Sequence, residues 1–339
     1  MACAFSGNSI THNNDLQKTF IAISAIALFS IGCGGVTLIS PLSPTPIIEP
    51  TWTFKPLPTS TLTATAQPTG TSTETSTPAP SLTPLPVFTD TPTLTPELEW
   101  SLQGPGEVVV PMLLYHHIGG SPSDSPYYVS ENAFEQQMYL LHEWGYQTIS
   151  VELLIEAIKN GALLPSKPII LTFDDGSQTV STTALPIMQK YGFTGTAYIV
   201  YNYIGLTNDF MDVDQIRQLY AAGWEIGSHS ISHVDLTERT DRQQDEIVDS
   251  RIKLERRLSV PILTFAYPFG AYNEDSVRFA HFAGYIGAAG LGEKTSQGNK
   301  NLYYLYRMDI KGSDDISDFA LRLPWRNDVE PLPILTIIP

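Results

Sequence analysis

The chain has 339 residues, 42% of them hydrophobic, which is enough for one large domain or two small ones with a sizeable core. Its 35 acidic and 19 basic residues give a net charge of -16, which argues against nucleic acid or an anionic membrane surface as the main partner and fits a neutral or partly cationic polymer. The two cysteines, Cys3 and Cys33, precede every segment that could fold, so a disulfide framework and a cysteine-based zinc site are excluded.

An uncharged apolar run covers residues 19–40 and follows Lys18. Such a run is typical of an export signal or a membrane anchor. Within it, Ser30-Ile31-Gly32-Cys33 resembles a bacterial lipoprotein cleavage site, in which a small residue precedes the cysteine that receives the lipid. We therefore predict that residues 1–40 are a signal peptide or membrane anchor. A lipid on Cys33 or an uncleaved helix would tether the protein to the membrane, at the cell surface outside the cytoplasm.

Proline and threonine dominate the next segment, residues 41–103, which has few side chains that could build a core. We predict a disordered linker here. Because proline favours an extended chain of about 3.1 Å per residue, the linker could hold a domain far from the membrane. The folded domain is then expected over residues 104–339.

Apolar runs alternate with helical patterns through this domain. Strands are predicted over residues 108–115, 147–149, 168–173, 195–200, 225–228, 263–267, 285–289 and 303–310. Helices are predicted over residues 150–159, 177–191, 212–222, 235–258 and 273–283, with a further helix that buries Phe134, Met138 and Leu141. This alternation indicates an α/β fold, either a (β/α) barrel with parallel strands or an open doubly wound parallel sheet. In a barrel, working residues lie at the carboxyl ends of the strands.

The run Leu-Thr-Phe-Asp-Asp-Gly over residues 171–176 follows two isoleucines and has no polar alternation. It predicts a buried strand that ends by delivering Asp174 and Asp175 to a strand-to-helix loop. Two adjacent carboxylates repel each other, so their burial is costly unless they share a cation or a proton. We therefore expect other residues that would help to bind a cation beside these two carboxylates.

Two histidines fit this expectation. His229 and His233 follow another apolar segment, and their i, i+4 spacing predicts two imidazoles on one side of a helical turn. Two histidines and one aspartate can bind a divalent metal and leave positions for water.

These two motifs, together with Ala266-Tyr267-Pro268-Phe269-Gly270, resemble carbohydrate esterase family four, the metal-dependent polysaccharide deacetylases. The resemblance covers about residues 108–310 and implies a distorted (β/α) barrel. It also implies that a divalent metal, with zinc expected, binds to Asp175, His229 and His233, and that Asp174 is the general base. Residues Tyr267, Pro268, Phe269 and Gly270 would bind substrate, with the main-chain N–H of Phe269 donating to the oxyanion.

Two departures from the family pattern concern the catalytic groups. The arginine that usually orients the base is replaced by Ala266, and Arg307 is a candidate substitute. The acid that protonates the leaving amine is usually a late histidine, yet none follows His281. Tyr115-His116 resembles the opening motif of the exopolysaccharide (poly-N-acetylglucosamine) deacetylase subgroup. Closure of a barrel would put this first strand beside the last one, so we predict His116 as the catalytic acid, with His117 as the alternative.

The resemblance implies a hydrolase that removes N-acetyl groups from an amino-sugar polysaccharide, such as an exopolysaccharide or cell-wall glycan. We expect the protein to be a monomer. An O-acetyl xylan esterase is the alternative within the same fold. A tethered glycan-binding protein with a disused site is the alternative from another class, but binding alone needs no paired acids beside a metal. A glycosidase would need its two carboxylates about 5 Å or more apart across the sugar and would not need the histidines.

Overall fold

The computed structural model describes residues 99–119 and 125–326. The predicted anchor of residues 1–40, the lipidation candidate Cys33 and all of the predicted linker before residue 99 lie outside these ranges. In the part of the chain that is described, no helix is long and apolar enough to cross a membrane.

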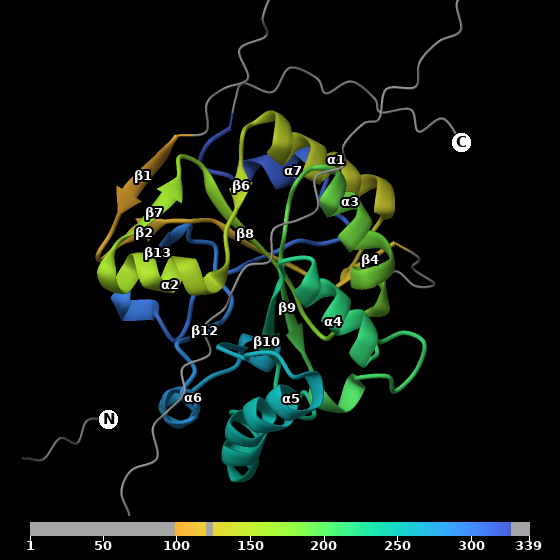
Figure 1. Cartoon of the computed structure of the whole chain (residues 1–339), viewed down its shortest axis with the longest axis vertical. Helices are drawn as coiled ribbons and strands as arrows, with labels where there is room; N and C mark the ends of the chain where they lie inside the picture. Colours follow the sequence, from red (N-terminus) through yellow and green to blue (C-terminus); the bar gives the residue numbers. More distant parts are fainter. Residues whose placement is uncertain (1–98, 120–124, 327–339) are drawn as a thin grey trace, which may run out of the picture. The chain divides into compact units, whose positions relative to one another are not determined.

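A sheet of eight parallel strands forms the centre of the domain (Figure 1). Its strands are β3 (Met112–Tyr115), β6 (Gln147–Thr148), β8 (Pro168–Phe173), β9 (Thr196–Ile199), β10 (Glu225–Ser228), β11 (Thr264–Ala266), β12 (Gly287–Ala289) and β14 (Met308–Asp309). The order is β12-β11-β10-β9-β8-β3-β14, and β6 also pairs with β8. Every residue of β8 is buried, as expected for a parallel strand covered on both faces.

The two edges of this sheet meet, so the sheet curls into a distorted barrel. Strand β14 lies beside β3, with Met308 opposite Leu113. The segment just before β14 lies beside β12, where a parallel bridge joins Leu305 to Ala289 and the Leu305 N–H donates to the Ala288 carbonyl at 2.8 Å. The predicted (β/α) barrel is confirmed, the first predicted strand lies beside the last, and the open doubly wound sheet is excluded.

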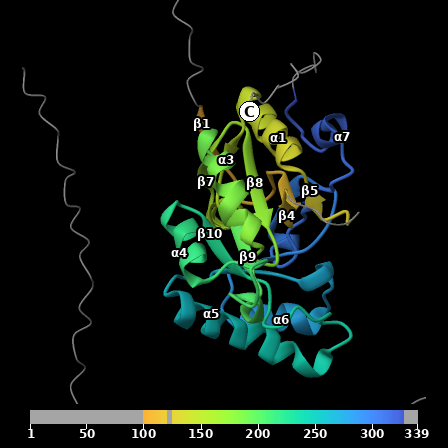
Figure 2. The same cartoon turned by 90° about the vertical axis from the view of Figure 1, so that its right-hand side faces the viewer.

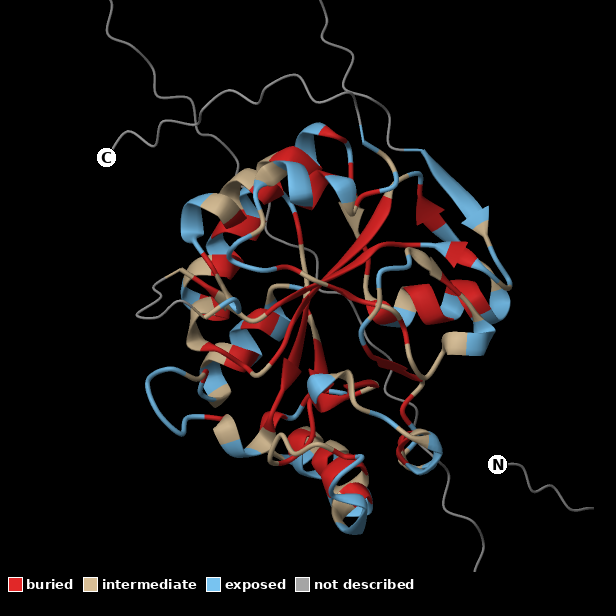
Figure 3. Cartoon of the chain, turned by 180° about the vertical axis from the view of Figure 1, so that it is seen from behind, coloured by how far each residue is buried: buried red, intermediate tan, exposed pale blue. Residues whose placement is uncertain are grey.

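Helices surround the barrel and turn their apolar faces toward it (Figure 3). Two of the predicted starts are marked by caps, since the side chains of Ser150 and Asp212 each accept a backbone N–H of the first helical turn. In the described residues the α-helices are α1 (Glu131–Glu143), α2 (Val151–Asn160), α3 (Leu185–Lys190), α4 (Val213–Ala221), α5 (Ser250–Leu258), α6 (Glu274–Phe282) and α7 (Ile316–Leu321).

The helix predicted over residues 235–258 and the strand predicted over residues 303–310 are shorter than expected, each for a local reason. The predicted helix over residues 235–258 begins late, because the Asp235 carboxylate accepts the Thr237 N–H at 2.8 Å and forms a turn. In the predicted strand over residues 303–310, the Tyr304 N–H donates to the Asn301 carbonyl, so the strand itself is only Met308–Asp309, and Leu305 contributes a single bridge.

The first predicted strand, residues 108–115, is divided at Pro111, which has no N–H to donate. Its first part, β2 (Val108–Val109), pairs antiparallel with β13 (Ser296–Gln297), and its second part is β3. A further short pair, β4 (His117–Ile118) and β5 (Tyr128–Val129), follows β3 in the chain.

The folded domain begins earlier than the predicted boundary at residue 104. Strand β1 (Trp100–Gln103) pairs antiparallel with β7 (Ala162–Pro165), on the opposite side of the domain from α5 (Figure 2). The sequence of β1, Trp-Ser-Leu-Gln, alternates apolar and polar residues, but three of its four side chains are exposed. Its hydrogen bonds come from the backbone, which composition does not reveal.

Candidate active site

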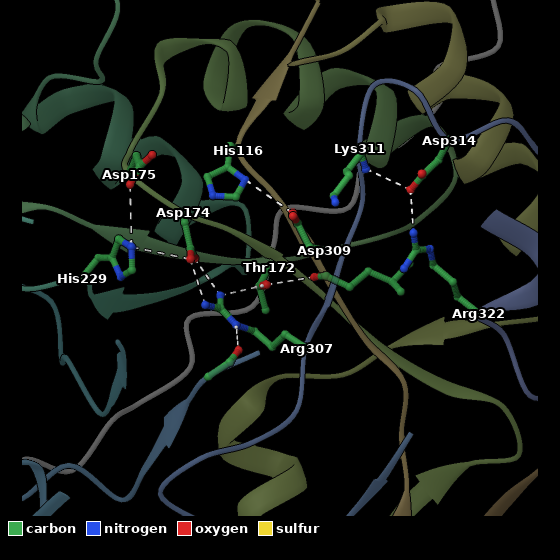
Figure 4. A network of polar contacts seen from close by, with 12 residues as sticks. His116, Thr172, Asp174, Asp175, His229, Arg307, Asp309, Lys311, Asp314 and Arg322 are labelled. Carbon is green, nitrogen blue, oxygen red and sulfur yellow. Dashed lines mark hydrogen bonds and ion pairs between the residues drawn. The ribbon is translucent and has the colours of Figure 1, made fainter. Parts of the chain in front are cut away.

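A pocket of about 260 Å³ opens at the carboxyl ends of the barrel strands. Its polar lining includes His116, Asp174, Asp175, His229, His233 and Arg307. These residues come from distant parts of the chain, and those labelled in Figure 4 point toward one another. The position agrees with the rule that barrels carry their working residues on the loops that follow the strands.

Three side chains of this pocket form a cluster that fits a cation. One ligand atom each from Asp175, His229 and His233 lies within 4.8 Å of the other two. Asp175 Oδ1 is 3.7 Å from His229 Nε2 and 3.3 Å from His233 Nε2. Ligands that bind one ion at about 2.1 Å are themselves roughly 3.0 to 3.4 Å apart, so small movements would complete the site.

Both imidazoles are neutral, which is the form that binds a metal. His229 Nδ1 lies 2.8 Å from the Ala266 carbonyl oxygen, to which it donates, so that Nε2 faces Asp175 with a free lone pair. Burial lowers the pKa of His229 to about 3, against the opposing effect of Asp174. Burial also lowers the pKa of His233.

The segment that joins these histidines is a loop, so the predicted helical turn is wrong. Ser230 and His233 adopt left-handed backbone conformations, with φ of 72° and 56°. A spacing of i, i+4 suits a helix, but a tight loop with left-handed residues brings the two rings together as well. Asp175 and Phe269 also have positive φ, of 69° and 60°. Such conformations cost about 1–3 kcal/mol each for residues other than glycine and cluster at functional sites.

Arg307 holds the first of the two adjacent carboxylates. Its guanidinium donates to both oxygens of Asp174, at 2.7 and 2.8 Å, and its Nε donates to the Gly290 carbonyl. Burial raises the pKa of Asp174, but the charge and hydrogen bonds of Arg307, with a further contribution from the neighbouring His229, outweigh it and bring the pKa to about 2. Asp174 is therefore ionised at neutral pH. The arginine expected beside Asp174 is thus Arg307, from the segment between β12 and β14.

The pKa of the second carboxylate, Asp175, is shifted in the opposite direction. Burial, with a further contribution from Asp174, raises the pKa of Asp175 to about 7. Its Oδ1 is buried and has no hydrogen-bond partner among the described residues. A buried acceptor without a donor is costly, so this oxygen is available to a ligand.

Both adjacent histidines line the pocket, but they differ in their contacts, because His117 Nδ1 lies 2.8 Å from Ser177 Oγ. His116 Nδ1 is 3.9 Å from Asp309 Oδ1, and its ring packs against Tyr127 at 4.7 Å. Burial lowers the pKa of His116 to about 4, so the ring is neutral at pH 7.

The predicted substrate-binding segment forms one rim of the pocket. Tyr267, Phe269 and Gly270 line the pocket, whereas Pro268 is buried. The Phe269 ring packs against His233 at 4.6 Å and is 62% exposed. An exposed aromatic ring therefore lies at the mouth of the pocket.

Sequence reasoning missed two carboxylates that belong to this site. Asp309 was not predicted, because a single aspartate in a short strand belongs to no recognisable motif. Its position two residues after Arg307 could have indicated it, since both residues line the pocket. Glu246 lies in a predicted helix, and only the fold brings it to the loop between the histidines.

The chain is similar to proteins of known family over much of the domain. Residues 163–288 match the family described as polysaccharide deacetylase. The Bacillus subtilis protein YxkH, which is classed with the polysaccharide deacetylases, is 28% identical over 202 residues, covering 59% of this chain and 71% of that protein. A poly-beta-1,6-N-acetyl-D-glucosamine N-deacetylase from Staphylococcus aureus is 26% identical over 210 residues, covering 58% and 71%. The structure of the Streptococcus pyogenes deacetylase PplD, solved in complex with acetate, superposes with a TM-score of 0.59 and 26% identity, covering 64% and 98%.

Proposed function

Because this chain belongs to the polysaccharide deacetylase family, we propose that it is a metal-dependent hydrolase that removes N-acetyl groups from an amino-sugar polysaccharide. The observation that carries the proposal is a single pocket in which an Asp-His-His cluster lies beside a second carboxylate that Arg307 keeps ionised. A protein that only bound glycan would need neither of these features. The name of the Staphylococcus aureus relative makes poly-β-1,6-N-acetylglucosamine the first polymer to test.

Asp175, His229 and His233 would hold the divalent ion, which we propose to be zinc because two imidazoles and one carboxylate are a common zinc set. When bound, such an ion supplies Lewis acidity, which makes water a stronger nucleophile and polarises the acetyl carbonyl. The unpaired Oδ1 of Asp175 and the free Nε2 atoms of the histidines support this assignment.

Asp174 is assigned as the general base. It is ionised and lies 3.6 Å from His229 Nε2, so it is close to the cluster, while Arg307 occupies both of its oxygens. The two adjacent carboxylates thus differ in pKa, about 2 against about 7, and such a separation accompanies separate roles in proton transfer. Asp174 would accept a proton from the attacking water.

The oxyanion would lie against the turn after β11, where we assign the Phe269 main-chain N–H as a donor. The left-handed φ of Phe269 supports this, because a strained residue persists only where its surroundings hold it.

His116 would donate the proton that the departing amine requires. Its ring is neutral at rest, so the role needs groups that favour the imidazolium: the charge of Asp174 opposes the lowering of the His116 pKa, and the Asp309 carboxylate lies 3.9 Å from Nδ1. His117 is the weaker candidate, since Ser177 already binds its Nδ1.

The polymer would cross the rim of the pocket over exposed apolar side chains. Tyr127, Phe269 and Leu291 line the pocket and are exposed. Tyr272 follows the same turn, is 45% exposed and stacks on Tyr304 at 4.0 Å. One face of the Tyr272 ring is therefore covered, which leaves the other to pack against a sugar ring.

We further propose that the protein works as a monomer outside the cytoplasm, tethered to the membrane by a lipid on Cys33 or by an uncleaved N-terminal helix. The charge-free run of residues 19–40 supports this location. An acetylated polymer in the envelope would be reached across the proline-rich linker.

Acetate release by the purified full-length protein tests the proposed function. We expect release from poly-β-1,6-N-acetylglucosamine, loss of release with a chelator and recovery on addition of Zn²⁺. Release from acetylated xylan alone would identify an O-acetyl esterase instead. Binding to the polymers without acetate release would identify the glycan-binding alternative.

A further inference from the structure

The loop that carries both histidines of the cluster is held in an unfavourable conformation. Ser230 and His233 are left-handed, and Ser230 Oγ accepts the His233 N–H at 2.9 Å. Left-handed conformations are unfavourable for residues other than glycine, so other contacts must stabilise the loop. On one side these come from the backbone, because the Tyr201 and Asn202 N–H groups donate to the Ser230 and Ile231 carbonyls.

On the other side of the loop lies Glu246, whose side chain is fully buried. Its Oε2 accepts the Ile231 N–H at 2.9 Å and the Ser232 N–H at 2.8 Å. Its Oε1 accepts the Ser232 hydroxyl at 2.5 Å, and the Arg242 guanidinium lies 2.6 Å away from the same oxygen. Both carboxylate oxygens are therefore used, and the negative charge is paired.

The hydrogen bonds of Glu246 hold Ile231 and Ser232, which lie between His229 and His233. None of them is made to a residue that lines the pocket. Without an acceptor at this position, the Ile231 and Ser232 N–H groups would be buried without partners, and the loop would relax toward a conformation that pairs them. Any such change would move the two Nε2 atoms relative to Asp175. Groups that orient metal ligands in this way commonly control affinity for the metal.

We propose that Glu246 is a positioning residue that sets the metal affinity of the Asp175, His229 and His233 site. The proposal rests on the proposed function only in requiring that this cluster binds a divalent ion. It makes Glu246 part of the metal site without being a ligand.

Glu246→Gln is the direct variant, because glutamine keeps the size of the side chain but replaces one of its two oxygens, both of which accept hydrogen bonds here, with an NH2 group that cannot accept, and removes the negative charge that pairs with Arg242. The matched control is Glu225→Gln. Glu225 Oε2 also accepts two consecutive backbone N–H groups, those of Val151 and Glu152, but at the opposite end of the barrel. Both variants should lower thermal stability, whereas only the first should alter the metal site.

The test is the dissociation constant for Zn²⁺ alone, measured by calorimetry on the metal-free full-length proteins, together with thermal unfolding. We expect Zn²⁺ binding about tenfold or more weaker in Glu246→Gln and unchanged in Glu225→Gln. Equal affinities in Glu246→Gln and wild type, or an equal loss in both variants, would overturn the proposal. A wild-type protein that fails to bind Zn²⁺ would instead contradict the metal site itself.

If Glu246→Gln does not fold, Ser232→Ala provides the second variant. It removes only the hydroxyl contact with Oε1 and should weaken Zn²⁺ binding by a smaller factor, with wild-type thermal stability of the metal-free protein. Wild-type affinity in Ser232→Ala would then count against the proposal.

Discussion

The two ends of the barrel both hold buried or partly buried carboxylates, but the surroundings of these groups differ. At the amino ends of the strands, Glu225 accepts hydrogen bonds from the Val151 N–H at 2.7 Å and from the Thr264 hydroxyl at 2.9 Å. At the carboxyl ends, Asp175 Oδ1 is buried without a partner among the described residues. A carboxylate whose oxygens are filled stabilises the fold, whereas one left open is available to a ligand.

Backbone strain follows the same division. Among the described residues, five other than glycine have positive φ: Asp175, His233 and Phe269 line the pocket, and Ser230 lies in the loop that joins its two histidines. The fifth, Ser259, ends helix α5, where left-handed residues are common. At the pocket end of the barrel, unfavourable conformations are therefore kept because they hold the side chains of the site in place. The following variants compare this end with the other one.

The largest effect is expected for Asp174→Asn. We expect acetate release to fall about 1,000-fold while zinc stays bound, because the amide cannot accept a proton from water. Parallel measurement of zinc content and acetate release checks this. Thermal unfolding must accompany it, since the variant leaves the buried Arg307 guanidinium without its charge partner. Near wild-type turnover would remove Asp174 as the base.

A smaller loss is expected for His116→Ala, about 100-fold on amide substrates, as for a positioned general acid. An activated ester should lose much less, because a good leaving group hardly needs a proton. The control is His117→Ala, whose ring is bound to Ser177 outside the proposed chemistry. Equal losses on amide and ester, or a matching loss in the control, would assign the acid elsewhere.

For the rim, Tyr272→Ala should lower kcat/KM about three- to tenfold on oligosaccharides that reach beyond the pocket, and leave the shortest substrates unaffected. Tyr220→Ala is the matched control, because Tyr220 is 43% exposed on α4, against 45% for Tyr272. Kinetics over a series of chain lengths provide the measurement. A loss that is the same at every length would mean that Tyr272 supports the pocket and not the polymer.

At the other end of the barrel, Glu225→Gln should leave acetate release unchanged and lower the free energy of unfolding by about 1–3 kcal/mol, because an NH2 group replaces one of the two oxygens that accept hydrogen bonds there. Urea denaturation and the acetate assay together measure this. A loss of turnover without a loss of stability would contradict the view that Glu225 stabilises the fold and takes no part in the reaction.

Local motifs singled out side chains that the fold brings together in one pocket, because the adjacent aspartates and the paired histidines each need a partner of the other's chemistry. The barrel could also be predicted from the sequence, since continuous apolar runs mark buried parallel strands and alternate with helical patterns. The loop geometry at Ser230 and His233 could not be read, because the same spacing fits a helix. Glu246 and Asp309 were missed because their partners are distant in sequence and meet them only in the fold.

The most direct test of the open carboxylate is a zinc titration of the metal-free protein at pH 6 and pH 8, with proton release measured in buffers of different ionisation enthalpy. Burial raises the pKa of Asp175 to about 7, so this group is mostly protonated at pH 6 and mostly ionised at pH 8. His229, with a pKa of about 3, has no proton to give at either pH. We predict about one zinc ion per chain, with nearly one more proton released from Asp175 at pH 6 than at pH 8. Wild-type zinc affinity in both His229→Ala and His233→Ala would contradict the account.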